Sequence, residues 1–272
     1  MGPAGFDLPA YLARIGYSGP CEPTLSVLQA VHALHPAAIP FEAIDPLLRR
    51  EVSLDLDALQ AKLVGQRRGG YCFEQNTLLE AALSALGFRV TRMLGRVRWM
   101  RPAEAPPGPR THLLLRVAID GVDFLADVGF GSLVLGGPLR LDVAGPQEVP
   151  VARVRLVSGG QGVTLQADLD GVWHDAYRFT YDPVELSDCV CGNWFTSTHP
   201  QALFTGNLVV ERLTASCRYR LFNTKLTARH HDGRLETRIL EDAATLGTVL
   251  ETVFGVSPPV DPGEIWRRLP VS

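Results

Sequence analysis

The sequence contains little that would bind a polyanion or enter a membrane. Its formal net charge is −3, and only two of its basic residues, Lys62 and Lys225, are lysines. Nucleic-acid binding requires a basic face, which this charge balance does not supply. No apolar run reaches the roughly 18–20 residues that cross a bilayer, and the first residues lack the basic and apolar regions of a secretory signal. We therefore expect neither nucleic acid nor membrane among the partners.

Cysteine is also scarce, and its pattern excludes a disulfide framework. The odd number and irregular spacing of the cysteines predict reduced thiols in a cytoplasmic protein. Cys189 and Cys191, followed by His199, lack the paired spacing of a zinc site, so no metal is expected. The cysteines are Cys21, Cys72, Cys189, Cys191 and Cys217.

Helix signals dominate the N-terminal third of the chain. Asp7 is placed to cap a first helix, which Gly16 ends, and Thr24 is placed to begin a second. A short third segment is expected over about residues 57–64. A fourth helix is expected to begin at Cys72, because an apolar stripe at helical spacing follows it.

Between about Phe88 and Val190 the apolar period changes to two, which indicates strands. Proline- and glycine-rich turns separate the runs. After residue 191 we expect further strands and a final helix that Asp242 caps and Gly255 ends. The expected strands are Phe88 to Trp99, His112 to Ile119, Val122 to Val128, Val151 to Val157 and Val163 to Ala167.

Cys72 occupies a position that suits a reactive thiol. Two glycines, Gly69 and Gly70, precede it and allow a tight turn and a close approach by a substrate. At the start of a helix, unpaired N–H groups and the helix dipole favour a thiolate. A cysteine with this placement can equally be an inert buried residue, so the position alone does not decide its role.

A predicted hairpin brings a histidine and a carboxylate together. Asp120-Gly121 is a strong signal for a two-residue turn, which would pair Ile119 with Val122. In that register one face of both strands is entirely apolar and must face the core. His112 and Asp127 then share the opposite face, with their backbones about 7–8 Å apart along the diagonal. At this backbone separation the two side chains are long enough to meet in a hydrogen bond.

These three residues together predict a catalytic triad. A carboxylate on one imidazole nitrogen fixes the tautomer of the ring and leaves the other nitrogen to deprotonate a thiol. Taken singly, His112 could be a solvated residue at a strand end, and Asp127 a carboxylate beside a turn. Their predicted proximity, together with Cys72 at a helix start, favours the catalytic interpretation.

The same residues lie in segments that resemble the arylamine N-acetyltransferase family. The resemblance covers essentially the whole chain, in the family's order and spacing. Ala43 is a departure, because asparagine is expected there, but it affects no predicted catalytic residue. The matching segments are Tyr11-Leu12-Ala13-Arg14-Ile15-Gly16-Tyr17, Ile39-Pro40-Phe41-Glu42, Arg67-Arg68-Gly69-Gly70-Tyr71-Cys72-Phe73-Glu74-Gln75-Asn76, Thr111-His112-Leu113-Leu114-Leu115 and Asp127-Val128-Gly129-Phe130-Gly131.

This resemblance implies an α+β fold with a papain-like arrangement of Cys, His and Asp. Its parts would be an N-terminal helical bundle (residues 1–87), a β-barrel (88–190) and a C-terminal α/β lid (191–272). It also implies acetyl-coenzyme A as donor and aromatic amines or hydrazines as acceptors. Matching positions suggest that the acceptor pocket is lined by Phe41, Phe130 and Phe204, for each of which simple core packing is the alternative.

The function predicted first is therefore ping-pong transfer of an acetyl group through Cys72. A related amide synthase, in which the amine belongs to the same molecule as a polyketide acyl group, would have the same triad. A cysteine hydrolase or peptidase, with water or a peptide as acceptor, is a third hypothesis. An inactive binding module would require a broken triad, and the triad is intact in this sequence.

Overall fold

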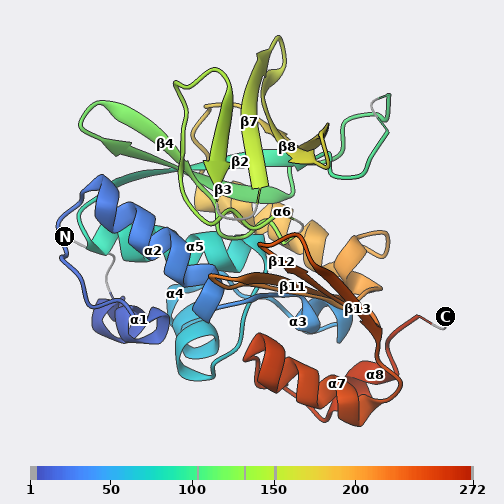
Figure 1. Ribbon diagram of the computed structural model, residues 1–272. Coiled ribbons are helices and arrows are strands. Elements are labelled where there is room, and N and C mark those ends of the chain that lie inside the picture. Colours follow the sequence, from blue (N-terminus) through green and yellow to red (C-terminus); the bar gives the residue numbers. More distant parts are fainter. Residues whose placement is uncertain (1–4, 103, 132, 150–151, 271–272) are drawn as a thin grey trace.

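The computed structural model combines one helical layer with two antiparallel sheets (Figure 1). An eight-stranded sheet lies at one end of the molecule, and a five-stranded sheet with two helices lies at the other. The N-terminal helices fill the space beside and between them. The residues described are 5–102, 104–131, 133–149 and 152–270.

The helices and strands alternate in blocks along the chain. The helices are α1 (Leu8–Ile15), α2 (Leu25–Ala38), α3 (Ile44–Leu47), α4 (Leu56–Leu59), α5 (Cys72–Ala85), α6 (Leu186–Thr198), α7 (Ala243–Val249) and α8 (Pro262–Trp266). Wider π-helical turns continue α4 over Gln60–Gly65 and α7 over Leu250–Phe254, and a 3₁₀ turn spans Leu203–Thr205. The strands are β1 (Phe41–Glu42), β2 (Arg89–Val97), β3 (His112–Ile119), β4 (Val122–Ala126), β5 (Leu139–Arg140), β6 (Pro146–Val149), β7 (Ala152–Gly159), β8 (Gly162–Leu169), β9 (Val172–Phe179), β10 (Val209–Leu213), β11 (Cys217–Phe222), β12 (Lys225–His230) and β13 (Leu235–Ile239).

The predicted helix boundaries in the N-terminal third are largely confirmed. The Asp7 carboxylate accepts a hydrogen bond of 2.9 Å from the N–H of Ala10, and Gly16 ends α1 with φ of 72° in the left-handed region. Thr24 precedes α2 as predicted. Its hydroxyl, however, contacts the hydroxyl of Ser26 instead of capping the helix.

The predicted β3–β4 hairpin is confirmed in its register. Ile119 pairs with Val122 across a turn in which Asp120 and Gly121 have φ of 49° and 80°, the left-handed values that a type I′ turn requires. The apolar face of the hairpin packs into the core, as its register requires. His112 and Asp127 are not part of this apolar cluster.

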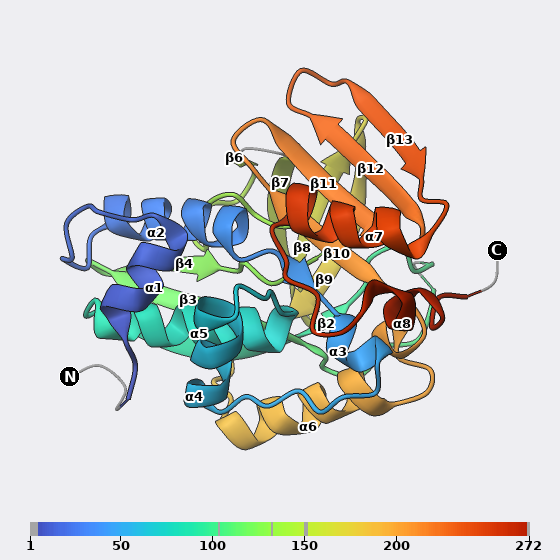
Figure 2. The same cartoon turned by 90° about the horizontal axis from the view of Figure 1, so that it is seen from below.

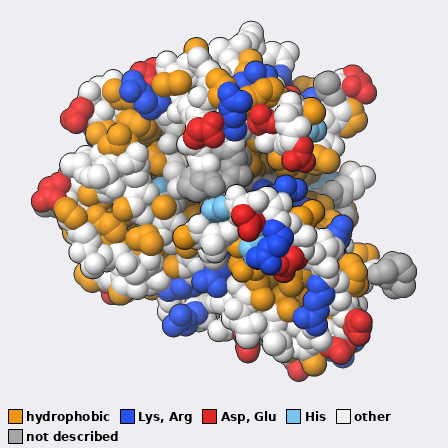
Figure 3. Space-filling model, in the orientation of Figure 1, with side chains coloured by type: hydrophobic (Ala, Val, Ile, Leu, Met, Phe, Trp, Pro, Cys, Tyr) orange, Lys and Arg blue, Asp and Glu red, His pale blue; other side chains and the backbone are white. Residues whose placement is uncertain are grey.

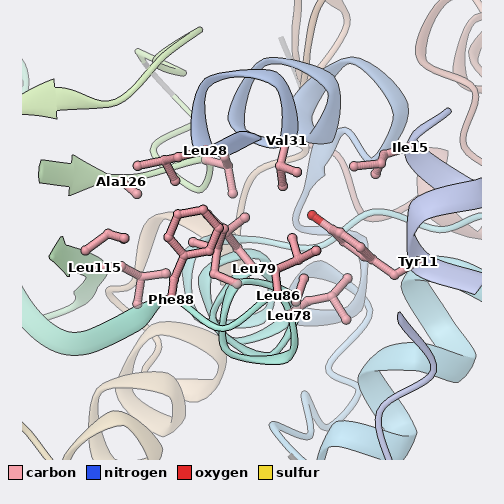
Figure 4. Packing of buried hydrophobic residues seen from close by; sticks show 14 of the residues in the cluster. Tyr11, Ile15, Leu28, Val31, Leu78, Leu79, Leu86, Phe88, Leu115 and Ala126 are labelled. Atoms are coloured by element: carbon pink, nitrogen blue, oxygen red, sulfur yellow. The ribbon is translucent and has the colours of Figure 1, made fainter. Parts of the chain in front are cut away.

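Helix α5 is the centre of the helical layer. Its apolar stripe packs against α1 and α2 on one side and against β3 and β4 on the other (Figure 4). Leu79 on α5, Leu28 on α2 and Leu115 on β3 are among its buried residues. This packing fixes the axis of α5, and with it the position of Cys72 at the start of the helix.

The eight-stranded sheet runs in the order β5-β4-β3-β2-β9-β8-β7-β6 and is nearly closed, in agreement with the predicted barrel. The side chain of Gln147 on β6 accepts a hydrogen bond from the N–H of Arg140 on β5 and donates one to its carbonyl, each 2.9 Å long. The Gln147 side chain thus joins β5 and β6, the two edge strands of the sheet, which are not paired with each other through their backbones over their described residues.

The five-stranded sheet has the order β1-β10-β11-β12-β13. Its first strand comes from the N-terminal part of the chain, where Phe41 pairs with Glu211 of β10. Helix α7 lies across one face of this sheet (Figure 2), and a buried cluster that includes Leu221 and Leu246 joins them. A tight turn around residues 231–233 connects β12 to its antiparallel neighbour β13.

The secondary structure of the C-terminal part differs from the prediction at two points. Helix α6 occupies Leu186–Thr198, where no helix was predicted, and α8 follows the helix predicted to be the last. Residues of α6 such as Val190 and Trp194 favour strands by intrinsic preference. Burial of one helix face, including Cys189 and Asn193, overrides that preference.

The surface agrees with the near-neutral composition. Acidic and basic side chains are interspersed on the face shown in Figure 3. Among the described residues, no helix has both the length and the apolar character to span a bilayer.

A buried group of five charged side chains lies beneath the start of α5. Lys62 contacts Asp45 and Glu74 at 2.6 Å each, and Arg68 contacts Glu42 at 2.7 Å and Asp45 at 3.0 Å. Burial raises the pKa of Glu74 to about 7, although Lys62 opposes this shift. The two cations therefore compensate three carboxylates that would otherwise be costly to bury.

We expect Lys62→Met to lower the free energy of unfolding by about 3 kcal/mol, because it leaves buried carboxylates uncompensated. The loss should be larger above about pH 7, where Glu74 is ionised, than below it. Urea unfolding at both pH values measures this. Lys225→Met, at the exposed second lysine, is the matched control and should change stability by less than about 0.5 kcal/mol. Equal stability of the two variants would contradict the role assigned to Lys62.

Candidate active site

Cys72 is the first residue of α5, and a capping box fixes the start of this helix. The carboxylate of Glu74 accepts a hydrogen bond of 3.1 Å from the N–H of Tyr71. A Cβ at Gly70 would come within 2.8 Å of Glu74, so the glycine permits this contact. Cys72 is 5% exposed, and its thiol points toward the carbonyl of Thr111, with Sγ 3.6 Å from the oxygen. The thiol is thus held at the edge of the interior.

His112 begins β3 and forms a buried pair with Asp127. Its Nε2 lies 2.7 Å from Oδ2 of Asp127, and both side chains are almost fully buried. Cys72 is also close enough to the imidazole to contribute to raising its pKa. Since Nε2 faces the carboxylate, Nδ1 is the nitrogen available to the thiol. The structure therefore brings together the three residues predicted as a triad.

The electrostatics of this pair favour the charged forms. Burial alone would lower the pKa of His112, but the charge and hydrogen bond of Asp127, together with Cys72, outweigh burial and raise the pKa to about 10. Burial would raise the pKa of Asp127, but His112, Asn76 and the N–H of Gly129 lower it. An imidazolium beside a carboxylate is thus the stable state over the neutral range.

Four hydrogen bonds saturate the carboxylate of Asp127. Its Oδ1 accepts from the Asn76 amide and from the N–H of Gly129, at 2.9 Å each. Its Oδ2 accepts from the Tyr177 hydroxyl at 2.8 Å in addition to His112. The orientation of the carboxylate is therefore fixed by partners on several elements.

Asn76 and Tyr177 are site residues that the sequence analysis missed. Asn76 lies one turn after Cys72 on the same face of α5, which is the signal that could have identified it. It also donates to the carbonyl of Leu113 at 2.7 Å and accepts from the N–H of Val128 at 3.1 Å. Tyr177 comes from β9, and no local pattern indicates its role.

The backbone N–H of Asp127 has an unusual partner. It donates to Nε2 of His32, a fully buried histidine of α2, at 3.1 Å. Burial lowers the pKa of His32 to about 4, so this imidazole is neutral and acts as an acceptor. His32 is thus favoured in its neutral form, whereas the raised pKa of His112 favours its protonated form.

A cavity of about 510 Å³ opens beside Cys72 and His112. Phe41, Phe130 and Phe204, the three predicted pocket residues, all line it. The ring centroids of Phe41 and Phe204 are 5.7 Å apart, and that of Phe130 is 5.0 Å from His112. Asp127 is fully buried and is not among the lining residues.

The cavity is lined by residues from the N-terminal, central and C-terminal stretches of the chain. Helix α6 and the 3₁₀ turn after it form one wall, and the segment after β2 forms another. Its lining is largely apolar and aromatic, which suits a flat organic molecule. The lining residues include Val97, Trp99, Thr111, Gly129, Gly131, Phe195, Thr196, Leu203, Val209 and Arg220.

Two close approaches by the segment after β4 shape the cavity, one to a backbone atom and one to a side chain. A Cβ at Gly129 would lie 2.6 Å from Cα of Cys72, and one at Gly131 would lie 2.7 Å from the ring of Phe41. Both glycines are therefore required by the packing. In the part of the chain that the structure describes, no group of three or more His, Cys, Asp or Glu side chains could hold a metal ion.

The combination of a buried thiol, a charged imidazole–carboxylate pair and an aromatic cavity suits covalent catalysis of acyl transfer. A family model described as N-acetyltransferase matches residues 24–260. The chain is 42% identical over 253 residues to an arylamine N-acetyltransferase of Mycolicibacterium smegmatis, covering 92% of each chain. It is 39% identical over 247 residues to one from Escherichia coli, covering 90% of this chain and 87% of that one.

Solved structures agree with this likeness. The arylamine N-acetyltransferase of Mycobacterium marinum superposes with a TM-score of 0.93 at 38% identity, covering 96% of this chain and 98% of that one. The same enzyme in complex with CoA gives a TM-score of 0.92 with the same coverage and identity. The chain therefore belongs to the arylamine N-acetyltransferase family and is an enzyme of that family, as its sequence motifs predicted.

The buried pair should make stability depend on pH in a defined direction. Because the pKa of His112 is raised, its contribution is complete below about pH 6.5 and is lost as the pH rises toward about 10. The lowered pKa of Asp127 makes its contribution complete above about pH 4 and lost in acid. The difference in unfolding free energy between the wild type and His112→Gln should therefore shrink from about pH 6 to about pH 9. Urea titrations measure this difference, and a constant value would exclude the charged pair.

Proposed function

We propose that this enzyme transfers an acetyl group from acetyl-coenzyme A to the nitrogen of an arylamine or arylhydrazine, with Cys72, His112 and Asp127 as catalytic triad. The observation that carries the proposal is that a thiol and a carboxylate-bound imidazole meet at the wall of one aromatic cavity. The relative from Mycobacterium marinum in complex with CoA supports the choice of donor. The names of the relatives support the choice of acceptor.

In the first half-reaction the thiolate of Cys72 attacks the carbonyl carbon of the thioester. The bond between that carbon and the sulfur of coenzyme A breaks, and the leaving thiolate takes the proton that His112 holds. The hydrogen bond from His112 to Asp127 keeps Nδ1 directed at the reacting sulfur atoms. An acetyl-Cys72 thioester and neutral imidazole remain.

In the second half-reaction the amine nitrogen attacks the carbonyl carbon of acetyl-Cys72. The C–S bond breaks, the thiolate of Cys72 returns, and the proton lost by the nitrogen passes to His112. Phe41, Phe130 and Phe204 would hold the aromatic ring of the acceptor by apolar and edge-to-face contacts. Their arrangement around the cavity supports this role.

A cysteine hydrolase and an amide synthase have the same triad but different acceptors. The apolar, aromatic lining offers little to position a water molecule, which favours an amine over water. A cavity of about 510 Å³ suits a small acceptor better than a polyketide chain that carries its own amine. Both features favour intermolecular transfer to a small amine.

The decisive test is intact-mass spectrometry of the protein mixed with acetyl-coenzyme A in the absence of amine. The wild type should gain one acetyl group, Cys72→Ala should gain none, and added amine should remove the adduct. Initial rates should follow ping-pong kinetics. An unmodified wild-type protein, or equal labelling of the variant, would refute the covalent mechanism. Rapid release of coenzyme A without amine would indicate a hydrolase instead.

A further inference from the structure

Strand β13 is an open edge of the five-stranded sheet. It pairs with β12 on one side only, all five of its residues are exposed, and Figure 2 shows it as the outermost strand of the sheet. Over the described residues the other edge strands are shorter: β1 and β5 have two residues each, and β6 has four and is joined to β5 through the Gln147 side chain. An open edge presents N–H and C=O groups to which a further strand can bind.

Hydrogen bonds at both ends of the β12–β13 pair show which backbone groups of β13 face outward. The N–H of His230 donates to the carbonyl of Arg234 at 2.9 Å, and the N–H of Leu240 donates to the carbonyl of Thr224 at 2.8 Å. Bonded and non-bonded pairs alternate along an antiparallel ladder, and the register between these two ends is unbroken. The even-numbered residues of β13 therefore bond to β12, and the odd-numbered residues direct their N–H and C=O groups away from it.

The sequence of this edge is complementary to itself. Two copies of β13 that pair antiparallel about Thr237 place Leu235 opposite Ile239 and Glu236 opposite Arg238. In this register the odd-numbered residues, whose backbone groups face outward, form the hydrogen-bonded pairs between the two copies. A two-fold axis relates the copies, so each side-chain contact is formed twice.

The side chains at this edge suit such a pairing. Leu235 and Ile239 are 53% and 56% exposed, and pairing would cover both. Glu236 and Arg238 would lie in non-hydrogen-bonded pairs, where cross-strand side chains are closest and opposite charges attract. Within the chain Glu236 contacts Arg234 at 2.6 Å, and a carboxylate has the capacity to accept from two guanidiniums.

We propose that β13 is an interface at which two copies of this chain join edge to edge, so that their five-stranded sheets continue into one another. The occupant of the edge is a second copy, because the strand is complementary to itself in hydrogen bonds, apolar contacts and charge. An edge of five residues buries less than the roughly 1,200 Å² of a stable interface, so the dimer is weak and depends on protein concentration.

Sedimentation velocity over about a hundredfold range of protein concentration tests the proposal, and the wild type should shift toward a dimer as the concentration rises. Arg238→Glu places carboxylates on both sides of each charged pair and should raise the dissociation constant of the dimer at least about tenfold. The double variant Glu236→Arg/Arg238→Glu restores opposite charges and should return this constant to within about threefold of the wild type. An equal loss in the single and the double variant would overturn the assigned register.

Mixing two single variants gives a second result that only this register predicts. Glu236→Arg has two basic side chains at the edge, and Arg238→Glu has two acidic ones, so neither should pair with itself. An equimolar mixture of the two proteins should form a heterodimer, because each basic side chain then lies opposite an acidic one. A mixture that associates no better than its separate components would contradict the proposed pairing.

Arg89→Glu is the matched control. Arg89 is an exposed residue of β2 in the eight-stranded sheet, and reversing its charge should leave the dissociation constant of the dimer unchanged. Thr237→Pro removes an N–H that faces outward, which an edge strand tolerates, and should abolish the dimer while the circular dichroism spectrum of the monomer is kept. A wild type that stays monomeric at every concentration, or a dimer that persists in Thr237→Pro, would overturn the proposal.

Discussion

The carboxylate of Asp127 is the group on which the arrangement of the site depends. A buried charge is tolerated only when its lone pairs are satisfied, and here α5, β3, β9 and the chain after β4 each supply a donor or a cation. The same contacts that compensate the charge also fix the distance between α5 and the sheet. Loss of any one partner would therefore disturb both the charge and the geometry around His112.

Close packing carries this constraint from Asp127 to the cavity. Gly129 lies against the backbone of Cys72, and Gly131 lies against the ring of Phe41, so the segment after β4 positions both the thiol and one wall of the cavity. On the other side, the hydroxyl of Tyr71 hydrogen-bonds to Asn193 of α6. The start of α5 is thus fixed by contacts with the barrel-like sheet and with the C-terminal part of the chain.

The sequence predicted those features that depend on local signals. The β3–β4 register followed from a two-residue turn and an alternating pattern, and it brought His112 and Asp127 together correctly. Tyr177 could not be predicted, because it reaches Asp127 from 50 residues away along the chain. Helix α6 was missed because tertiary burial overrides the strand preference of its residues, and β1 has only two residues, too few to show a period.

The central claim, that a buried charged pair orients His112, is tested most directly by NMR titration of the His112 imidazole in the wild type and in Asp127→Asn. In the wild type the imidazole should stay protonated to about pH 9, because the carboxylate outweighs burial. In Asp127→Asn the opposing charge is lost, so His112 should titrate below its usual value of about 6.5. A wild-type imidazole that is neutral at pH 7, or the same titration in both proteins, would contradict the account.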